Sequence, residues 1–305
     1  MLYDIVVIGA GPAGLTAALY AGRAEKSVLV IEKESFGGQI THSPRVENYP
    51  GFEVISGNEL ADRLIEQVFA QGAEIELDEV TSIEGKLGEY KVVCKGGEYD
   101  ARTVIIATGS HHRTLGIEGE DALVGNGISY CAVCDGAFYK GKTVAVIGGG
   151  NSALVDAVML SESCAKVYIV QNLPYLTGEK RLATLLESRE NVEIILSTTV
   201  KSFVEKDGEL SGIVLSSESG EHTLSVDGIF VAIGQKPENE PFASVTSLNE
   251  YGYIVSDESC VPEGASEGIF VAGDCRTKSV RQVATACADG AVAALAACRL
   301  IDGNK

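Results

Sequence analysis

The residues with the clearest chemical potential are two cysteines separated by two positions, Cys131 and Cys134, with Asp135 directly behind them. A close pair of thiols can pass two electrons by closing and opening one disulfide, and the thiolate is the reactive form. The pattern predicts a redox-active pair at the start of a helix, where the helix dipole would lower a thiol pKa.

Two other uses of the pair are weaker. A zinc half-site needs four ligands, and the sequence offers no second close Cys or His pair, so no metal is expected. A static structural disulfide does not suit a reducing compartment. The other cysteines are scattered and are expected to be small buried apolar residues; they are Cys94, Cys164, Cys260, Cys275, Cys287 and Cys298.

Bulk composition limits the class of protein. The 305 residues exceed what one core usually serves, which predicts two domains. The net charge of −19 argues against nucleic acid or an anionic membrane surface as partner. The N-terminus runs straight into an apolar strand without the layout of a signal peptide, and residues 284–300 are interrupted by Asp289 and indicate a packed helix, not a membrane span. A cytoplasmic protein is expected.

The chain begins with a pattern typical of dinucleotide binding. An apolar strand (residues 3–8), a glycine-rich loop, a helix (15–23) and a second strand (27–31) that ends at Glu32 form one βαβ unit. Its glycines allow a tight turn, a close approach of the pyrophosphate and close helix packing, while Glu32 would bind a ribose hydroxyl. The loop consists of Gly9, Ala10, Gly11, Pro12, Ala13 and Gly14.

A second unit repeats this design from residue 143 onward. Strand 143–147, a glycine loop, helix 153–161 and strand 166–170 follow one another. The second strand is followed by Gln171, which supplies neither an acid for a ribose hydroxyl nor an arginine for a 2′-phosphate. Two interpretations stay open: residual binding of a nicotinamide dinucleotide, or a structural remnant. The candidate binding residues are Gly148, Gly150, Asn151, Ser152 and Ala153.

The order of these units indicates an insertion. Two strands that end in Gly109 and Gly234 would close the two units, and residues 268–274 look like the return of the first domain at Gly273 and Asp274. The predicted fold class is α/β, with two Rossmann-like, doubly wound nucleotide-binding domains, the second inserted into the first. The expected domains are 1–114 and 243–305 for the first and 115–242 for the second.

In this order the motifs resemble the low-molecular-weight thioredoxin reductases over essentially the whole chain. The resemblance rests on the first glycine loop, Gly37-Gly38-Gln39, residues 47–51, the cysteine pair with Asp135, and Gly273-Asp274 followed by Arg281-Gln282. It implies a homodimer that holds FAD in the first domain and a nicotinamide cofactor in the second. The residues implied around FAD, beyond Gly9, Gly11, Pro12, Ala13, Gly14 and Glu32, are Gly38, Gln39, Asn48, Gly109, Gly273, Asp274, Arg281 and Gln282.

The resemblance also implies roles for the dithiol. Cys134 faces the flavin and accepts its electrons, Cys131 attacks the disulfide of thioredoxin or a thioredoxin-like protein, and Asp135 handles the proton. Rotation of the inserted domain would alternately bury and expose the pair.

One departure from the family pattern concerns the electron donor. Members that use NADPH carry His-Arg-Arg and a further arginine, where this chain has Gln171, Asn172, Leu173 and Thr177. Loss of these guanidinium groups should weaken NADPH binding by orders of magnitude. NADPH, NADH and reduced ferredoxin therefore all stay open as donors. A dithiol oxidase that uses O2 and a non-catalytic flavin redox sensor are the alternatives to a reductase.

Overall fold

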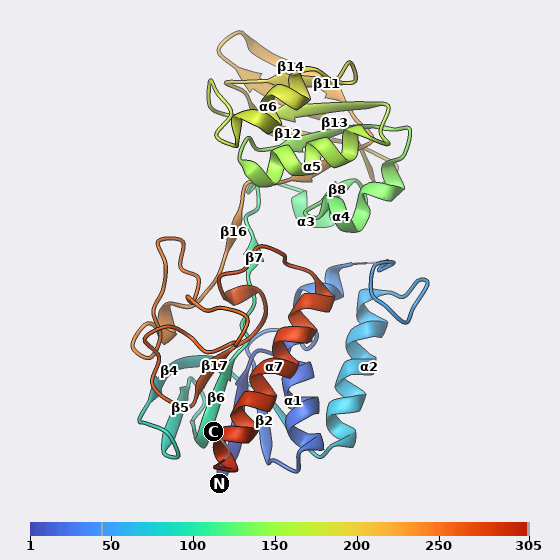
Figure 1. The fold of residues 1–305 in the computed structure, drawn as a ribbon. Helices are drawn as coiled ribbons and strands as arrows, with labels where there is room; N and C mark the ends of the chain where they lie inside the picture. Colours follow the sequence, from blue (N-terminus) through green and yellow to red (C-terminus); the bar gives the residue numbers. More distant parts are fainter. Residues whose placement is uncertain (44, 304–305) are drawn as a thin grey trace. The chain divides into compact units, whose positions relative to one another are not determined.

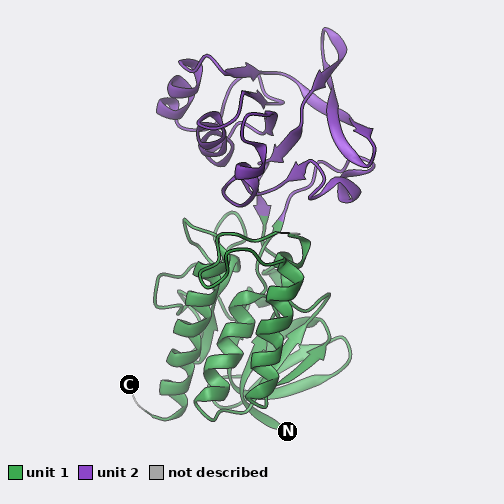
Figure 2. Cartoon of the chain, turned by 90° about the vertical axis from the view of Figure 1, so that its right-hand side faces the viewer, with its two compact units in different colours: residues 1–111, 236–305 green, residues 112–235 purple. Residues whose placement is uncertain are grey.

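The computed structural model describes residues 1–43 and 45–303 (Figure 1). The chain divides into unit 1, residues 1–111 and 236–305, and unit 2, residues 112–235, which is inserted into it (Figure 2). The chain passes between the units along β7 (His111–His112) and β16 (Gln235–Lys236), which pair with each other. The boundaries expected at 114 and 242 lie near these crossings, with Gly116 inside unit 2 and Pro241 inside unit 1.

The strands of unit 1 form one sheet. They are β1 (Leu2–Ile8), β2 (Val28–Glu32), β3 (Glu74–Leu77), β4 (Val80–Glu84), β5 (Tyr90–Cys94), β6 (Glu98–Ile106) and β17 (Ile269–Val271). The order is β3-β2-β1-β6-β5-β4, and β17 also pairs with β6. The β1, β2, β3, β6 and β17 strands run parallel, while β4 and β5 add an antiparallel extension. The continuous apolar run of β1 fits a central parallel strand that is buried on both faces.

Three helices cover one face of this sheet: α1 (Pro12–Arg23), α2 (Gly57–Ala70) and α7 (Val283–Ile301) (Figure 1). Helix α1 packs against both others, and a Cβ on Gly290 of α7 would lie 2.1 Å from the carbonyl oxygen of Ala13. By length and composition α7 is apolar enough to cross a membrane, but its Ala and Gly residues form this close packing against α1. The shorter helical turns are η1 (Gly38–His42), η3 (Glu240–Phe242) and η4 (Gly273–Cys275).

Unit 2 contains a parallel sheet and a separate antiparallel one. The parallel sheet consists of β8 (Ile128–Ser129), β9 (Thr143–Ile147), β10 (Lys166–Val170), β11 (Val192–Ile195) and β15 (Gly228–Val231) in the order β11-β10-β9-β15-β8. The antiparallel sheet consists of β12 (Thr199–Lys206), β13 (Glu209–Ser217) and β14 (Gly220–Ser225). The helical segments are α3 (Glu120–Leu123), α4 (Ala132–Asp135), η2 (Gly136–Tyr139), α5 (Asn151–Ser161) and α6 (Lys180–Glu187). Apolar clusters fill both faces of the parallel sheet, so the predicted fold class is confirmed for both units.

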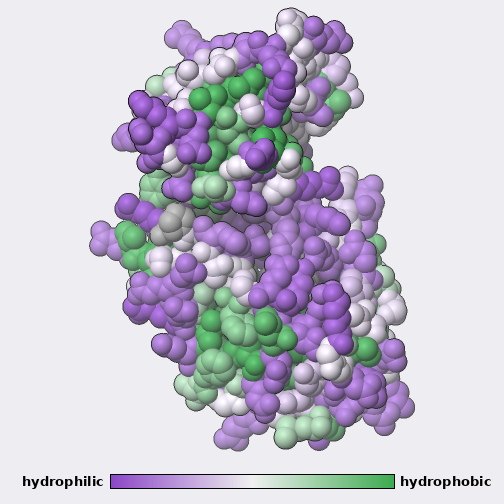
Figure 3. All heavy atoms as spheres, turned by 180° about the vertical axis from the view of Figure 1, so that it is seen from behind, coloured by the Kyte–Doolittle hydropathy of each residue, from purple (hydrophilic) through white to green (hydrophobic). Residues whose placement is uncertain are grey.

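Charge lies mainly on the surface. Figure 3 shows hydrophilic residues over much of the face that it presents, with apolar residues gathered in separate areas. Several of the described ion pairs join side chains that are both well exposed, and such pairs contribute little to stability. A pair between Arg276 and Asp289 is different, because both side chains are almost fully buried.

Candidate active site

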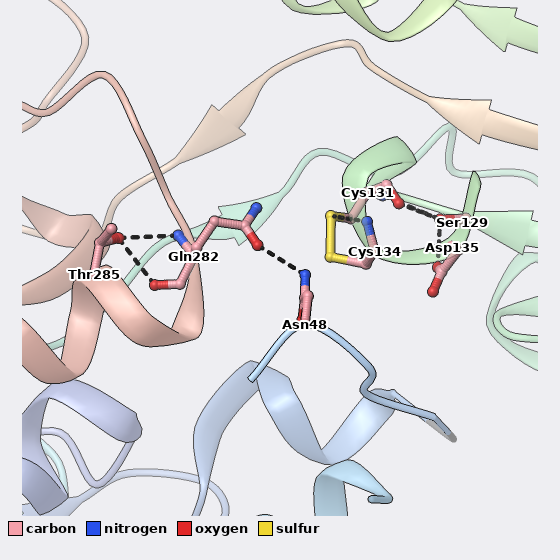
Figure 4. Close-up of a disulfide and its surroundings, with 7 residues drawn as sticks. All are labelled: Asn48, Ser129, Cys131, Cys134, Asp135, Gln282 and Thr285. Carbon is pink, nitrogen blue, oxygen red and sulfur yellow. Dashed lines mark hydrogen bonds between the residues drawn. A yellow bond between two sulfur atoms is a disulfide. The ribbon is translucent and has the colours of Figure 1, made fainter. Parts of the chain in front are cut away.

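The two cysteines of the sequence motif form a disulfide (Figure 4). Strand β8 ends at Ser129, and Cys131 then caps the single turn of α4, where its carbonyl oxygen accepts hydrogen bonds from the N–H groups of Cys134 and Asp135. Ala132 is buried at this turn, whereas Val133 is 57% exposed. The sequence predicted a helix start at the pair, and the helix found there is one turn that continues as η2.

The carboxyl group of Asp135 lies beside this turn in a partly buried position. Burial raises its pKa above the ordinary value, and a hydrogen bond from Ser129 acts in the opposite direction. The Oγ of Ser129 lies 2.6 Å from Oδ2 of Asp135 and 3.1 Å from the N–H of Cys131 (Figure 4). A carboxyl group of raised pKa is suited to proton transfer near neutral pH. The sequence singled out Asp135 but missed Ser129.

The first glycine loop has the geometry that close approach of a ligand requires. Gly9 has a φ of +106°, and a Cβ there would lie 2.4 Å from the carbonyl oxygen of Ala107. A Cβ on Gly14 would lie 1.9 Å from the carbonyl oxygen of Gly9, so both positions exclude side chains. Gly11 caps α1, and a Cβ there would meet no heavy atom within 4 Å, which leaves open space at the helix N-terminus.

The carboxylate of Glu32 accepts backbone hydrogen bonds just beyond the ends of β1 and β2. Its Oε2 accepts a hydrogen bond from the N–H of Ala10 at 2.8 Å, and its Oε1 accepts one from Glu34 at 2.9 Å. Glu32 also lines a cavity in unit 1 together with Gly9, Val80 and Thr108. The predicted pairing of a glycine loop with an acid at the end of the second strand is therefore present in space.

Other predicted residues of unit 1 gather around the same loop. Gly38 lies against Gly11, because a Cβ on Gly38 would be 3.1 Å from the Cα of Gly11. Gln39 and His111 are joined by a 3.1 Å hydrogen bond between Nε2 and Nδ1. Gly109 has a φ of +70° just beyond β6 and lies in open space.

The turn that follows strand β17, at Gly273 and Asp274, also packs against the first glycine loop. A Cβ on Gly273, whose φ is +80°, would lie 2.8 Å from the Cβ of Ala13. Oδ1 of Asp274 is buried and has no hydrogen-bond partner within the described residues. Burial raises the pKa of Asp274. An unpaired buried carboxyl oxygen needs a partner, and a hydroxyl donor from a ligand would satisfy it.

Arg281 and Gln282 stand at the start of α7. Arg281 lies 4.5 Å from the centre of the Tyr253 ring, and its Nε is buried without a hydrogen-bond partner in the described part of the chain. Gln282 caps α7 with Thr285 and accepts a 3.1 Å hydrogen bond from Nδ2 of Asn48 (Figure 4). The structure thus joins Asn48 to Gln282, two positions that lie far apart in the sequence.

The second glycine loop keeps the backbone form of the first. Gly148 has a φ of +130°, and a Cβ there would lie 2.5 Å from the carbonyl oxygen of Ala232. Gly150 caps α5, and Ala153 is buried in its first turn, whereas Asn151 and Ser152 are exposed. Oδ1 of Asn151 accepts a 2.7 Å hydrogen bond from the N–H of Glu179.

The segment after β10 folds back over this second loop. The carbonyl oxygen of Gly149 accepts hydrogen bonds from the N–H groups of Thr177 (2.8 Å) and Gly178 (2.9 Å) and from Oγ1 of Thr177 (3.2 Å). The side chain of Gln171 also packs on Gly149, since a Cβ there would lie 2.5 Å from Nε2 of Gln171. The region where the family pattern places arginines is therefore filled by uncharged groups.

The sequence predicts that the other six cysteines are buried and that no metal is bound. All six cysteines outside the pair are free; five are buried and Cys287 is partly buried, which confirms the sequence prediction for the five. Among residues 1–43 and 45–303 no three His, Cys, Asp or Glu side chains are grouped to hold a metal ion.

Two dinucleotide-type units, one of which carries a Cys-x-x-Cys disulfide beside a partly buried carboxyl group, define a disulfide oxidoreductase. The chain belongs to the pyridine nucleotide-disulphide oxidoreductase family, whose profile matches residues 3–290. Membership in this family implies a flavin and a nicotinamide cofactor.

Three relatives define its position within the family. The chain is 44% identical to the thioredoxin reductase of Bacillus subtilis (strain 168), over 96% of this chain and 93% of the relative. The structure is similar to that of thioredoxin reductase from Streptococcus pyogenes MGAS5005, with a TM-score of 0.94, 35% identity and 99% of both chains covered. It is also similar to a ferredoxin-flavin thioredoxin reductase from Clostridium acetobutylicum, with a TM-score of 0.53, 31% identity and 99% of both chains covered. The resemblance predicted from the motifs is confirmed.

Proposed function

We propose that this protein is an FAD-dependent thioredoxin-disulfide reductase that passes electron pairs through Cys131 and Cys134 to thioredoxin or a thioredoxin-like protein. The observation that carries the proposal is the disulfide between these two cysteines, with a partly buried carboxyl group beside it, in a chain of this family. The dithiol oxidase and redox-sensor alternatives are not favoured, because the Bacillus subtilis relative and the Streptococcus pyogenes structure, which match at least 93% of their length, are both named thioredoxin reductases.

The residues of unit 1 fit FAD. The open space over Gly11 would admit the pyrophosphate at the N-terminus of α1, and the cavity lined by Glu32 would take the adenosine end. The unpaired Oδ1 of Asp274 would accept a hydrogen bond from a hydroxyl of the cofactor. The remaining positions around it would be Gly9, Pro12, Ala13, Gly14, Gly38, Gln39, Asn48, Gly109, Gly273, Arg281 and Gln282.

The chemistry of the dithiol follows from its residues. FAD, once reduced by the electron donor, would supply the two electrons that open the disulfide. The Cys131 thiolate attacks one sulfur of the partner's disulfide, which forms a mixed disulfide and releases one partner thiolate. The Cys134 thiolate then attacks Sγ of Cys131, the intramolecular disulfide forms again, and the second partner thiolate leaves. Asp135 donates a proton to a leaving thiolate and takes one back from water.

We propose that NADPH is a poor electron donor for this protein. The uncharged side chains of Gln171, Asn172, Leu173 and Thr177 offer no bidentate partner for a 2′-phosphate. NADH and reduced ferredoxin are the donors to compare, the latter because one similar structure is named a ferredoxin-flavin thioredoxin reductase. If a dinucleotide binds to unit 2, Gly148, Gly150, Asn151, Ser152 and Ala153 would contact it.

Anaerobic bleaching of the flavin by NADPH, NADH and reduced ferredoxin in parallel tests the donor. The expected result is bleaching by NADH or ferredoxin at concentrations where NADPH is ineffective; bleaching by micromolar NADPH would contradict it. Thioredoxin as acceptor is tested with Cys134→Ser, which should accumulate a mixed disulfide between Cys131 and thioredoxin. Cys131→Ser is the matched control and should form none.

We further propose a cytoplasmic homodimer. The six free cysteines fit a reducing compartment. Sedimentation of the flavin-loaded protein at micromolar concentration tests the dimer, and a monomeric mass would contradict it.

A further inference from the structure

A buried serine, Ser129, makes hydrogen bonds both to the backbone of Cys131 and to the carboxyl group of Asp135. Ser129 is the last residue of β8 and is only 4% exposed. Its Oγ is 3.1 Å from the backbone nitrogen of Cys131, which donates to it, and 2.6 Å from Oδ2 of Asp135 (Figure 4). One side chain therefore contacts both the first cysteine and the carboxyl group.

The number of hydrogens on the Ser129 hydroxyl decides which atom is the donor in its hydrogen bond with Asp135. A serine hydroxyl has one hydrogen, and the acceptors within reach are Oδ2 of Asp135 at 2.6 Å and the carbonyl oxygen of Cys131 at 3.4 Å. The shorter distance and the charge of a carboxylate favour donation to Asp135. Ser129 therefore stabilises the ionised form of the carboxyl group, while burial stabilises the protonated form.

Other groups near α4 have little influence on this balance. The titratable residues on the elements packed against α4 are Tyr139 on η2 and Asp156 and Glu162, on or next to α5. Burial is the larger cause of the raised pKa of Asp135, and the Ser129 hydrogen bond is the opposing one. Asp135 in turn contributes to the raised pKa of Tyr139, where burial is the main cause.

We propose that Ser129 is a positioning residue of the dithiol site: it holds the Asp135 carboxyl group in place and sets the pH at which that group gives up its proton. The inference rests on the proposed function only where it predicts a change in the rate of thioredoxin reduction. It assigns a role to a residue that makes no covalent bond in the reaction and that no motif marks.

Infrared difference titration of the Asp135 carboxyl in the flavin-loaded protein tests the inference directly, with Asp135→Asn to assign the band. Ser129→Ala should move the midpoint upward by about one to two pH units, because a hydrogen bond to the charged form is lost. Ser129→Thr keeps the hydroxyl and should restore the wild-type midpoint. Ser211→Ala is the matched control, because Ser211 is also a serine whose Oγ donates a hydrogen bond, but the acceptor is the carbonyl oxygen of Val204 and not a carboxyl group. An unchanged midpoint in Ser129→Ala, or an equal shift in Ser211→Ala, would overturn the proposal.

A second measurement separates this inference from the proposed function. In single turnovers of the prereduced protein with oxidised thioredoxin, the rate should fall at high pH as Asp135 loses its proton. That fall should move to higher pH in Ser129→Ala. Failure of the wild type to reduce thioredoxin would refute the proposed function, while the infrared midpoint would still decide the role of Ser129.

Discussion

Arg276 and Asp289 form a bidentate ion pair inside unit 1, with 2.9 Å from Nε to Oδ2 and 2.9 Å from Nη2 to Oδ1. Lys278 adds a 2.8 Å contact to Oδ2, and the N–H of Gly273 donates to the same oxygen at 3.0 Å. Burial opposes ionisation of Asp289, but the two cations outweigh it and hold its pKa below the ordinary range. The pair ties the corner at Gly273, next to Asp274, to helix α7.

Removal of one partner of this pair should therefore be costly. Asp289→Ala leaves the buried Arg276 guanidinium with only the exposed Glu258 as an acidic neighbour, at 3.5 Å, and we expect a loss of about 3–5 kcal/mol of unfolding free energy. Because the pKa of Asp289 is depressed in the folded state, its contribution should be complete above about pH 4 and be lost below it. Denaturant unfolding at several pH values measures both. Glu59→Ala, which breaks an exposed pair with Arg63, is the control and should cost less than about 1 kcal/mol. Equal losses in the two variants would contradict the argument.

Two glycines of the first loop should respond differently to a methyl group. Gly14→Ala places a Cβ 1.9 Å from the carbonyl oxygen of Gly9, so it should destabilise the fold by more than about 1 kcal/mol. Gly11→Ala meets no atom of the chain, so the apoprotein should keep its stability while flavin affinity falls at least tenfold. Unfolding and flavin titration separate the two effects. A Gly11→Ala protein that binds flavin normally would contradict the placement of the pyrophosphate.

The fold could be predicted from the sequence because its signals are local. The two apolar runs that are each followed by a glycine loop predicted β1 and β9 and the helices that follow them. Helix α1 begins at Pro12, earlier than expected, because proline suits the first turn of a helix. The antiparallel sheet of β12 to β14 carried no such signal and was not predicted.

The site could be predicted only where a motif marks it. Cys131, Cys134 and Asp135 are neighbours in the sequence, so their closeness in space does not depend on the rest of the fold. Ser129 has no pattern of its own, and its role depends on how β8 enters α4. The sequence marks Asp289 only as an interruption in an apolar helix, because its partner Arg276 is brought to it by the packing of α7.

A carboxyl group of α5 should make the stability of unit 2 depend on pH. Burial raises the pKa of Asp156 from 3.8 to about 6. The folded protein thus holds this proton more tightly than the unfolded chain, and stability should fall as the pH rises from about 4 to about 6. Asp156→Asn removes this fall and should be more stable than the wild type at pH 7.5, by at most about 3 kcal/mol. Urea unfolding at pH 4.5 and 7.5 measures the difference. Glu162→Gln, at an exposed position just after α5, should keep the wild-type pH dependence; the same dependence in Asp156→Asn would refute the assignment.

Guanidinium groups placed next to the second glycine loop should restore discrimination for a 2′-phosphate. Asn172 and Thr177 are exposed there, and the backbone N–H of Thr177 holds Gly149 whatever its side chain is. Asn172→Arg combined with Thr177→Arg should tighten NADPH binding relative to NADH by at least tenfold, since each charged hydrogen bond contributes about 1.5–3 kcal/mol. Isothermal titration calorimetry with each of the two dinucleotides measures the ratio. Asn172→Gln with Thr177→Ser is the uncharged control and should leave it unchanged. If neither dinucleotide binds to the arginine variant, the second loop is a structural remnant, and the electrons must enter the flavin by another route.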